Sequence, residues 1–497
     1  MKLGRLLEAI ERFIVKINLP EELKNAEVKF ISNNSNKLSD ASIFICRKGT
    51  KFDSHTIAEK LYSEGNVLAF VTEREINEKL PYVQVYDSRL AEAYIAAEFY
   101  EHPYKYLITF GVTGTNGKTT CAHLFHHIMQ QFGLTGSLSG TVMNDILGDK
   151  FYIHNTTPDA VTILDNMAKT YKNGGSYYSM EVSSHSLDQG RVETVQFDIA
   201  GLTNITRDHL DYHPTFEHYV NSKLHIFDLL KKDGVAIVNS DYLHYLNGRK
   251  VPRLVTYGTV DDSTYKISNI TTGWNGTTFM LHTPHGTRKV YTQMIGEYNA
   301  FNVTLVLAGL VEIGYELDEV ISYISTFRGV EGRFEPIPEA RRLGIEVVID
   351  FAHSPDALEK VIKSARKIAK GRLIVVYGAG GQADKGKRPM MAEVVTQLAD
   401  IAILTTDDPR GEDPEEIIQE VEKGIKPNSL SLTVLDRKEA IDTAITLATR
   451  GDVVLITGRG HEPYQVFSET LKIPFKDRDV ALDIIFSKIN KNHSSKD

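Results

Sequence analysis

YLITFGVTGTNGKTTCAHLFHHIM, residues 106–129, is the segment that decides the fold of this chain. Its first part, 106–114, is rich in aromatic and β-branched residues and predicts a strand. Its last part, CAHLFHHIM (121–129), predicts a helix. The loop between them, Gly111-Val-Thr-Gly-Thr-Asn-Gly-Lys-Thr-Thr120, therefore joins the end of a strand to the start of a helix, which is the setting of a phosphate-binding loop.

Each residue type in this loop suits the phosphates of a nucleotide. Glycines let backbone N–H groups close around phosphate oxygens, Lys118 can neutralise β- and γ-phosphate charge, and Thr119 can reach Mg²⁺. The strict Walker spacing needs a glycine at position 112, where Val112 stands, so the loop is a variant. The alternative is a glycine-rich turn with a chance GKTT. We predict nucleotide contacts from Gly114, Thr115, Asn116, Gly117, Lys118, Thr119 and Thr120.

Strand-like runs alternate with helical stretches on both sides of the loop, which predicts an α/β fold with a mostly parallel sheet. We divide the chain into three sections, 1–105, 106–335 and 336–497. Ligands of open α/β sheets bind beyond the carboxyl ends of the strands, so we seek chemistry in the loops that follow these runs. The runs are IFIC (43–46), VLAFV (67–71), YYSMEV (177–182), FDIAGLTN (197–204), GVAIVN (234–239), IEVVIDFAH (345–353), RLIVVYGAG (372–380), IAILTT (401–406) and VVLITG (453–458).

The composition bounds the class of protein. A chain of 497 residues is too long for a single core. Its 56 Lys+Arg against 65 Asp+Glu give a net charge of −9, which argues against a nucleic acid as the main partner. The two cysteines, Cys46 and Cys121, form no CxxC pair, so we expect two core residues rather than a disulfide or a cysteine zinc site.

We expect a cytoplasmic monomer. The first 16 residues carry Glu8, Glu11 and Arg12 among apolar residues, which suits an amphipathic helix better than a signal peptide. No run approaches the roughly 18 apolar residues that a membrane span needs.

Further motifs extend across all three sections. They are NTTPDA (155–160), MEVSSHSLDQGRV (180–192), TNITRDHLDYH (203–213), SKLHIF (222–227), GEYNAFN (296–302), GRFE (332–335), DFAHSPDAL (350–358), GAGGQADKGKRP (378–389), DDPRGEDP (407–414) and GRGHEPYQ (458–465). With the loop TGTNGKTT, this ordered set closely resembles the Mur ligases, and in particular the MurE branch, which joins a diamino acid to UDP-MurNAc-L-Ala-D-Glu. The resemblance implies an N-terminal UDP-sugar-binding domain, a central ATP-binding P-loop domain and a C-terminal Rossmann-like domain that binds the amino acid.

The resemblance implies an ATP-dependent ligase of peptidoglycan biosynthesis, with ADP and phosphate as products. A carboxylate is a poor electrophile because its leaving group would be oxide. Transfer of the γ-phosphoryl group gives an acyl phosphate, from which an amine can expel phosphate. Because the transfer brings several anions together, the site must supply Mg²⁺ and fixed positive charge.

The resemblance also assigns the catalytic and metal-binding residues. Glu181 and His209 match Mur metal ligands, and together with Thr119 they would form the Mg²⁺ environment. Lys223 matches the lysine that Mur ligases carbamylate, which turns a cation into an anion for a second Mg²⁺. Without the resemblance, Glu181 would be a helix-capping acid, His209 a core or surface histidine, and Lys223 a solvated charge. The catalytic set is therefore Lys118, Glu181, His209 and Lys223.

Nucleotide and substrate contacts follow from the same motifs. Asn299, Arg333, Asp350 and His353 resemble residues that hold ATP between sections, although an ion pair is the structural alternative for Arg333. Thr156, Thr157, Ser183, Gln189 and Arg191 match contacts to the UDP-sugar substrate and offer hydroxyl, amide and guanidinium donors to an anion. In Asn34-Ser35-Asn36 only Ser35 is kept of the family's Asp-Ser-Arg, and the neighbouring Thr50-Lys51-Phe52 lies in a substrate loop.

Departures from the family pattern bear on which amino acid is added. Enzymes of this branch that add meso-diaminopimelate read DNPR and carry an arginine before DKGKRP. Here Asp408 replaces the asparagine and Ala383 replaces the arginine, so the pocket loses one positive charge and gains a negative one. That change favours the ammonium end of lysine over a carboxylate, and we predict lysine with diaminopimelate as the alternative. The amino-acid site would comprise Asp407, Asp408, Pro409, Arg410, Gly458 and Glu462.

Two rival classes of protein remain. One is another enzyme of the same superfamily, such as folylpolyglutamate synthase, against which the DDPR and GRGHE motifs count. The other is a P-loop switch or motor that hydrolyses ATP to drive a partner. The acid at the end of YYSMEV would suit a motor, but the ligase-like motifs of the third section would serve no purpose in one.

Overall fold

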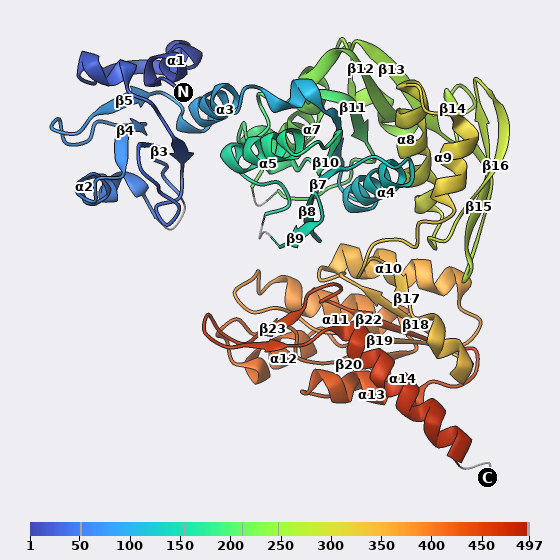
Figure 1. Ribbon diagram of the computed structural model, residues 1–497. Coiled ribbons are helices and arrows are strands. Elements are labelled where there is room, and N and C mark those ends of the chain that lie inside the picture. Colours follow the sequence, from blue (N-terminus) through green and yellow to red (C-terminus); the bar gives the residue numbers. More distant parts are fainter. Residues whose placement is uncertain (50–51, 153–154, 211, 247, 495–497) are drawn as a thin grey trace. The chain divides into compact units, whose positions relative to one another are not determined.

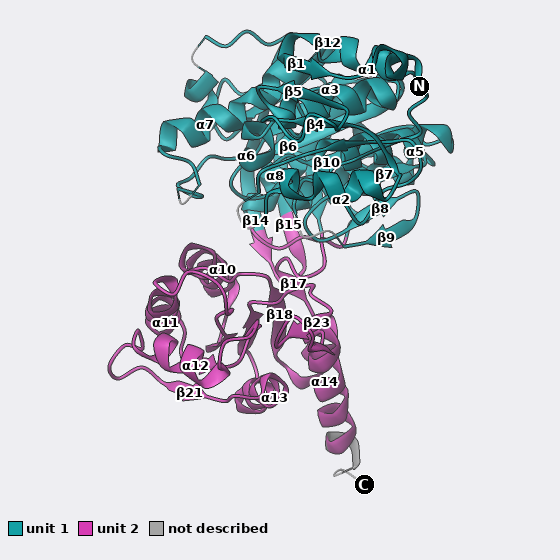
Figure 2. Ribbon diagram, turned by 90° about the vertical axis from the view of Figure 1, so that its left-hand side faces the viewer, with its two compact units in different colours: residues 1–271, 278–292, 297–327 teal, residues 272–277, 293–296, 328–497 magenta. Residues whose placement is uncertain are grey.

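The computed structural model describes residues 1–49, 52–152, 155–210, 212–246 and 248–494. These residues form two compact units, shown in different colours in Figure 2. Unit 1 comprises 1–271, 278–292 and 297–327, and unit 2 comprises 272–277, 293–296 and 328–497. Thr50 and Lys51, part of the predicted substrate loop, lie outside the described residues.

The N-terminal part of unit 1 is a five-stranded sheet in the order β1-β5-β4-β3-β2 (Figure 1). All neighbours are parallel except β1 and β5. The strands are β1 (Ile14–Asn18), β2 (Phe30–Ser32), β3 (Ser42–Ile45), β4 (Val67–Thr72) and β5 (Tyr82–Val85), and the helices are α1 (Leu3–Ala9), α2 (Ala58–Ser63) and α3 (Ser88–Phe99), with 3-10 turns at Glu11–Phe13, Glu21–Asn25 and Ser54–Ile57.

The predicted N-terminal helix over residues 1–16 is wrong beyond Ala9. Ile14–Asn18 forms strand β1, in which intermediate and exposed residues alternate. The β-branched residues Ile14, Val15 and Ile17 pack well on a pleated strand, and the segment gains an antiparallel partner in β5. Pairing with a distant strand therefore overrides the local helical pattern.

The central sheet has eleven strands in the order β16-β15-β14-β13-β12-β11-β6-β10-β7-β8-β9. The strands β7, β10, β6, β11, β12, β13 and β14 run parallel to their neighbours in this order. They are β6 (Ile108–Thr113), β7 (Gly136–Ser139), β8 (Asn144–Ile146), β9 (Asp149–Phe151), β10 (Tyr177–Glu181), β11 (Phe197–Leu202), β12 (Leu230–Asn239), β13 (Arg253–Gly258), β14 (Tyr265–Gly273), β15 (Gly276–Thr283) and β16 (Gly286–Thr292).

Helices cover this parallel sheet, as buried strands require. Residues of β6, β10 and β11 are almost all buried, and α4 packs on β6, β10 and β7 and against α8 and α9. The helices are α4 (Lys118–Gln131), α5 (Ala160–Lys172), α6 (Ser184–Asp188), α7 (Phe216–Leu224), α8 (Tyr298–Glu312) and α9 (Leu317–Ile324), with 3-10 turns at Pro103–Tyr106, His225–Leu229 and Ser240–Leu246.

Unit 2 is built around a six-stranded sheet in the order β17-β18-β22-β19-β20-β21, parallel except for β17, and a separate pair β23-β24. Its strands are β17 (Glu335–Pro336), β18 (Glu346–Asp350), β19 (Leu373–Tyr377), β20 (Ile401–Leu404), β21 (Ser431–Thr433), β22 (Val453–Thr457), β23 (Tyr464–Val466) and β24 (Lys472–Pro474). Its helices are α10 (Pro355–Ile368), α11 (Lys387–Leu398), α12 (Pro414–Glu422), α13 (Arg437–Leu447) and α14 (Asp477–Ser494), with a 3-10 turn at Pro338–Leu343.

The α/β prediction is confirmed, because every run assigned to a strand forms one within the described residues. Cys46 and Cys121 are buried and free, as expected of core residues. Among the residues that the structure describes, no helix is long and apolar enough to cross a membrane. The section boundaries at 105/106 and 335/336 stay predictions.

Candidate active site

The phosphate loop follows strand β6 and ends at the first residue of α4, as the sequence predicts. Gly114 and Gly117 have φ values of +147° and +89°, which side-chain-bearing residues rarely adopt. A Cβ at Gly117 would also collide with the amide of Asn302, so this loop needs glycine there for a second reason. The Nζ of Lys118 donates to the carbonyl oxygens of Gly114 (2.8 Å) and Thr115 (3.1 Å).

Glu181 is the last residue of β10, the strand beside β6, and its side chain is fully buried next to the loop. Its carboxylate accepts hydrogen bonds from Thr119 Oγ1 (2.9 Å), the Thr141 backbone N–H (2.7 Å) and Thr141 Oγ1 (3.2 Å). The parallel register of β6 and β10 thus brings the predicted metal-binding Glu181 and Thr119 into direct contact.

Lys223 lies on α7 and is 1% exposed. Its Nζ donates to the Gly114 carbonyl (2.8 Å) and lies 4.6 Å from the centre of the Tyr219 ring. Burial lowers the pKa of Lys223 well below its ordinary value, and the charge of Lys118 lowers it further, whereas Asp208 opposes the shift. A lowered pKa increases the share of the neutral amine, which is the form that can act as a nucleophile.

His209 lies in the loop after β11, with φ +52° and a half-exposed side chain. Its Nε2 is 3.7 Å from the Asp208 carboxylate, and its ring centre lies 6.3 Å from that of Tyr219. Tyr219 also contacts Lys223, and its hydroxyl is 2.9 Å from Thr115 Oγ1 of the phosphate loop. The structure therefore brings Lys118, Glu181, His209 and Lys223 around one loop.

The predicted substrate residues of the central section form a hydrogen-bond network that continues from Glu181. Thr157 Oγ1 donates to the Glu181 carbonyl (2.9 Å) and accepts from the Ser183 backbone N–H (3.1 Å). Arg191 donates to the Thr157 carbonyl (2.9 Å) and to Gln189 Oε1 (2.6 and 3.0 Å). Burial lowers the pKa of Arg191, and the charge of Arg47 lowers it further.

Three further predicted contact residues, Thr156, Ser35 and Asn299, belong to unit 1. Thr156 Oγ1 lies 3.1 Å from Thr141 Oγ1, which joins it to the same network. Ser35 occupies a turn after β2. Asn299 Oδ1 accepts from Asn302 Nδ2 (3.1 Å), the side chain that packs over Gly117.

In unit 2, Arg333, Asp350 and His353 lie together at the end of β18. Asp350 accepts from the backbone N–H groups of Phe334 (2.7 Å) and Ala352 (2.8 Å), and burial raises its pKa while Arg333 opposes the rise. The Arg333 guanidinium lies 5.0 Å from the Phe351 ring centre. The Nδ1–H of His353 donates to the Phe351 carbonyl (2.8 Å), and burial lowers the His353 pKa.

The predicted amino-acid residues also come together in unit 2. Asp408 is 1% exposed and forms a buried ion pair with Arg459, and it accepts from the Val466 N–H (3.0 Å). Arg410 Nη2 is 3.5 Å from Asp408. Burial, followed by the charge of Asp408, raises the pKa of Glu462 to about 7. Gly458 has a φ of +110° and no Cβ, which lets its backbone lie close to the Asp407 carboxylate. Pro409 lies between Asp408 and Arg410 in the chain.

Sequence reasoning missed three residues of these sites. Thr141 follows β7, a strand that was not predicted from the sequence. The signal that could have found it is a polar residue just after a strand of this sheet. Tyr219 connects three predicted residues by ring and hydroxyl contacts that spacing alone does not show. Arg459 stands inside the motif GRGHE, but nothing in that motif indicates that it pairs with Asp408.

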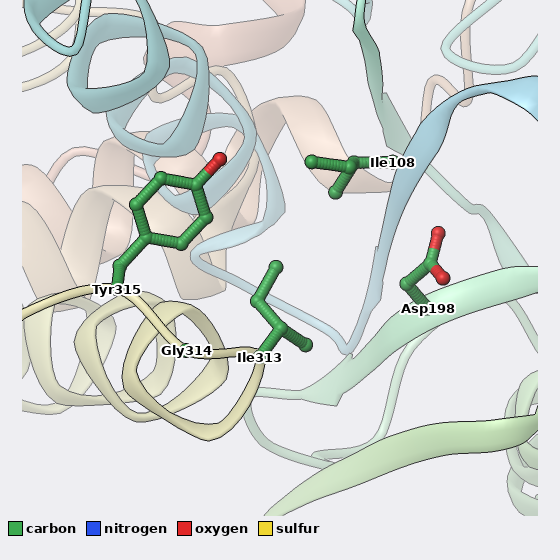
Figure 3. A pocket seen from close by; sticks show the side chains of 5 residues that line it. All are labelled: Ile108, Asp198, Ile313, Gly314 and Tyr315. Atoms are coloured by element: carbon green, nitrogen blue, oxygen red, sulfur yellow. The ribbon is translucent and has the colours of Figure 1, made fainter.

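A pocket of about 370 Å³ lies elsewhere in unit 1 (Figure 3). It is lined by Ile108 and Asp198, at the starts of β6 and β11, and by the turn Ile313–Tyr315. The phosphate loop follows the opposite, carboxyl end of β6. Asp198 is already engaged by Lys231 (2.8 Å) and by the Thr109 N–H (2.7 Å), so this pocket offers no free acid.

A strand–loop–helix cradle with a buried acid on the neighbouring strand defines a P-loop nucleotide-binding protein. The profile of the Mur ligase middle domain matches residues 112–310, and that of the Mur ligase glutamate ligase domain matches residues 332–460. The chain belongs to the Mur ligase family, whose members are ATP-dependent ligases, and it acts in peptidoglycan synthesis. The MurE resemblance of the sequence is confirmed by the relatives that follow.

A Bacillus cereus relative named UDP-N-acetylmuramoyl-L-alanyl-D-glutamate–2,6-diaminopimelate ligase is 38% identical over 99% of both chains. A Halalkalibacterium halodurans protein of the same name is 39% identical over 93% of this chain and 95% of its own. A solved structure with that name matches with a TM-score of 0.70 and 30% identity over 98% of this chain and 99% of that one. MurF of Thermotoga maritima in complex with ADP shares the fold at 19% identity, with a TM-score of 0.63, over 94% of this chain and 99% of that one.

Proposed function

We propose that this chain joins a diamino acid to UDP-MurNAc-L-Ala-D-Glu through an acyl phosphate, with ATP as the phosphoryl donor. The observation that carries the proposal is the contact between Thr119 of the phosphate loop and the buried Glu181, which leads directly into the Thr157–Arg191 network. A nucleotide cradle that contacts the Glu181 carboxylate and a polar network that starts at the Glu181 backbone carbonyl suit phosphoryl transfer to a bound acid.

The residues present fit Mg²⁺. Thr119, Glu181 and His209 would hold it, since hydroxyl, carboxylate and imidazole groups lie around the phosphate loop. The ion would offset the charge that gathers on the transferring phosphoryl group. Lys223 supports a second position, because its buried, low-pKa amine beside Gly114 is suited to react with CO₂ and become a carbamate anion.

The chain's own cations have separate tasks in this proposal. Lys118 would release its two loop carbonyls and bind the β- and γ-phosphates. Arg191, held by Gln189 and Thr157, would position the anionic substrate beside Glu181. Arg333 and His353 of unit 2 would contact the nucleotide, as their motifs imply.

We propose diaminopimelate as the added amino acid. Relatives that match nearly the whole chain are named 2,6-diaminopimelate ligases, which favours this amino acid over the lysine predicted from the sequence. The negative charge of Asp408, which prompted the lysine prediction, is offset by the buried partner Arg459. Arg410 is 45% exposed in its side chain and offers its guanidinium to a carboxylate.

Lysine is the second candidate, and specific residues favour it. Ala383 supplies no cation where diaminopimelate-adding enzymes have arginine. Asp407 Oδ2 is a buried acceptor to which no described residue donates a hydrogen bond, and Glu462 lies close to the same loop. These acids suit an ammonium group more than a carboxylate.

The choice is tested by steady-state kinetics with UDP-MurNAc-L-Ala-D-Glu, ATP and Mg²⁺, with meso-diaminopimelate and L-lysine supplied separately. We expect kcat/KM for diaminopimelate to exceed that for lysine by at least tenfold. The variant Ala383→Arg adds the missing cation and should raise the diaminopimelate preference further. A higher kcat/KM for lysine in the unmodified chain would transfer the assignment to lysine.

A further inference from the structure

Three side chains beside the candidate active site have the composition of a metal site. Asp188 is the last residue of α6, His213 lies in the loop before α7, and His218 lies in the first turns of α7. One ligand atom from each lies within 4.8 Å of the others. We propose that Asp188, His213 and His218 bind a transition-metal ion of the Zn²⁺ class, with water as a fourth ligand.

The geometry brings the donor atoms close to the spacing that such an ion needs. His213 Nδ1 and His218 Nδ1 are 2.9 Å apart, and Asp188 Oδ1 is 3.3 Å from His218 Nε2, so the His218 ring presents one nitrogen to each partner. Zinc–ligand distances of about 2.0–2.1 Å in a tetrahedron imply donor atoms about 3.3 Å apart. A rotation of the partly exposed His218 side chain would bring one ring nitrogen to both partners at this spacing.

Second contacts orient two of the three ligands. His213 Nε2 is 3.0 Å from Ser184 Oγ, so the Nε2–H can donate there and leave the Nδ1 lone pair directed at His218. The Tyr212 hydroxyl donates to Asp188 Oδ2 (2.7 Å), which leaves Oδ1 facing His218. Ligating histidines in zinc sites commonly donate their other N–H to a fixed acceptor, as His213 does here.

Access and ligand softness favour this ion over Mg²⁺. His213 is fully buried, whereas His218 is 42% exposed and Asp188 25% exposed in their side chains, so an ion can enter from solvent. Two imidazoles and one carboxylate suit Zn²⁺ better than a hard cation that demands six oxygen ligands. The set shares no residue with the proposed Mg²⁺ ligands Thr119, Glu181 and His209.

A bound ion would fix the elements that carry catalytic groups. It would join the end of α6 to α7, on which Lys223 lies five residues after His218. It would also hold His213, whose backbone N–H donates to the His209 carbonyl oxygen (2.9 Å).

The test uses the full-length chain, stripped with a chelator and then titrated with Co²⁺ in excess Mg²⁺, which fills harder oxygen sites. We expect one equivalent of Co²⁺ with the intense visible absorption of a four-coordinate ion, displaced by Zn²⁺. His218→Gln and Asp188→Asn should each weaken binding at least tenfold. Both side chains are partly exposed, so these variants are expected to fold, which circular dichroism checks.

Two controls separate this site from its neighbours. His244→Gln removes an exposed histidine whose ring packs on Tyr245, and it should leave the titration unchanged. Glu181→Gln alters the proposed Mg²⁺ site and should also leave it unchanged. The proposal is overturned if no saturable equivalent binds, if His218→Gln binds Co²⁺ as the unmodified chain does, or if Glu181→Gln abolishes the signal.

Discussion

Buried charged side chains dominate the candidate site at the scale of single residues. Glu181 is completely enclosed and is compensated only by hydrogen-bond donors, two of which come from Thr141. Lys223 is equally enclosed. Among the described residues, its amine contacts the Gly114 carbonyl oxygen and the Tyr219 ring. Such groups cost free energy when they are buried, so their retention beside a phosphate loop supports a catalytic use.

Substitution of Glu181 by glutamine tests its proposed role. The amide keeps the shape but loses the charge, and its NH₂ group can face the Thr141 N–H, which leaves a buried donor unsatisfied. We expect the free energy of unfolding to fall by about 1–3 kcal/mol. We expect kcat to fall at least a hundredfold, because a charged group beside the transferring phosphoryl is lost. Denaturant titration and steady-state ligation assays measure both, and a kcat within threefold of the unmodified value would contradict the assignment.

The raised pKa of Glu462 predicts that amino-acid binding depends on pH. Burial raises its pKa to about 7, so the carboxyl is protonated below that pH and ionised above it. An ammonium group prefers the ionised form, so the KM for the amino acid should fall as pH rises from 6 to 8. Glu462→Gln should lose this contribution and retain only the pH dependence of the amine itself. Identical KM profiles for the two proteins would show that Glu462 does not bind the ammonium.

The phosphate loop shows how an element depends on its glycines. Strand β6 delivers the loop, and α4 begins at Lys118, directly after Gly117 at φ +89°. The helix therefore directs its first N–H groups toward the space where phosphates bind. Asn302 of α8 packs against Gly117, so a second helix fixes the same turn.

The variant Gly117→Ala should disturb both the turn and the nucleotide site. The left-handed conformation costs an alanine about 1 kcal/mol, and the added Cβ also displaces the Asn302 amide. Calorimetric titration should show ADP affinity reduced at least tenfold. Gly133→Ala, at the other end of α4, is the matched control: its φ is +77° and its Cβ would meet nothing within 4 Å. Equal ADP affinity in the two variants would contradict a role of Gly117 in nucleotide binding.

At the scale of the whole molecule, the α/β class and the strand positions were predictable because buried parallel strands are continuous apolar runs. IVVY in β19 and VVLIT in β22 can hardly form anything else. The N-terminal strand Ile14–Asn18 was not predictable, since its half-exposed pattern gains meaning only from its pairing with β5. Local periodicity carries no information about such a distant partner.

The candidate site, like the fold, could be predicted from the sequence only in part. Thr119 and Glu181, which both stand inside ordered motifs, are in contact because parallel strands align their carboxyl ends. Thr141 and Arg459 were missed because their roles arise from side-chain packing between distant segments. The lysine prediction did not take Arg459 into account, because only the structure shows that this buried arginine pairs with Asp408.

The central claim, that ATP activates the substrate carboxylate as an acyl phosphate, has a direct isotopic test. UDP-MurNAc-L-Ala-D-Glu is prepared with ¹⁸O in the carboxylate that reacts, and the phosphate released during ligation is analysed by mass spectrometry. Our account predicts that one ¹⁸O atom passes to phosphate for each amide bond formed, with ADP as the other product. Phosphate that contains only unlabelled oxygen while the amide forms would contradict the proposed mechanism.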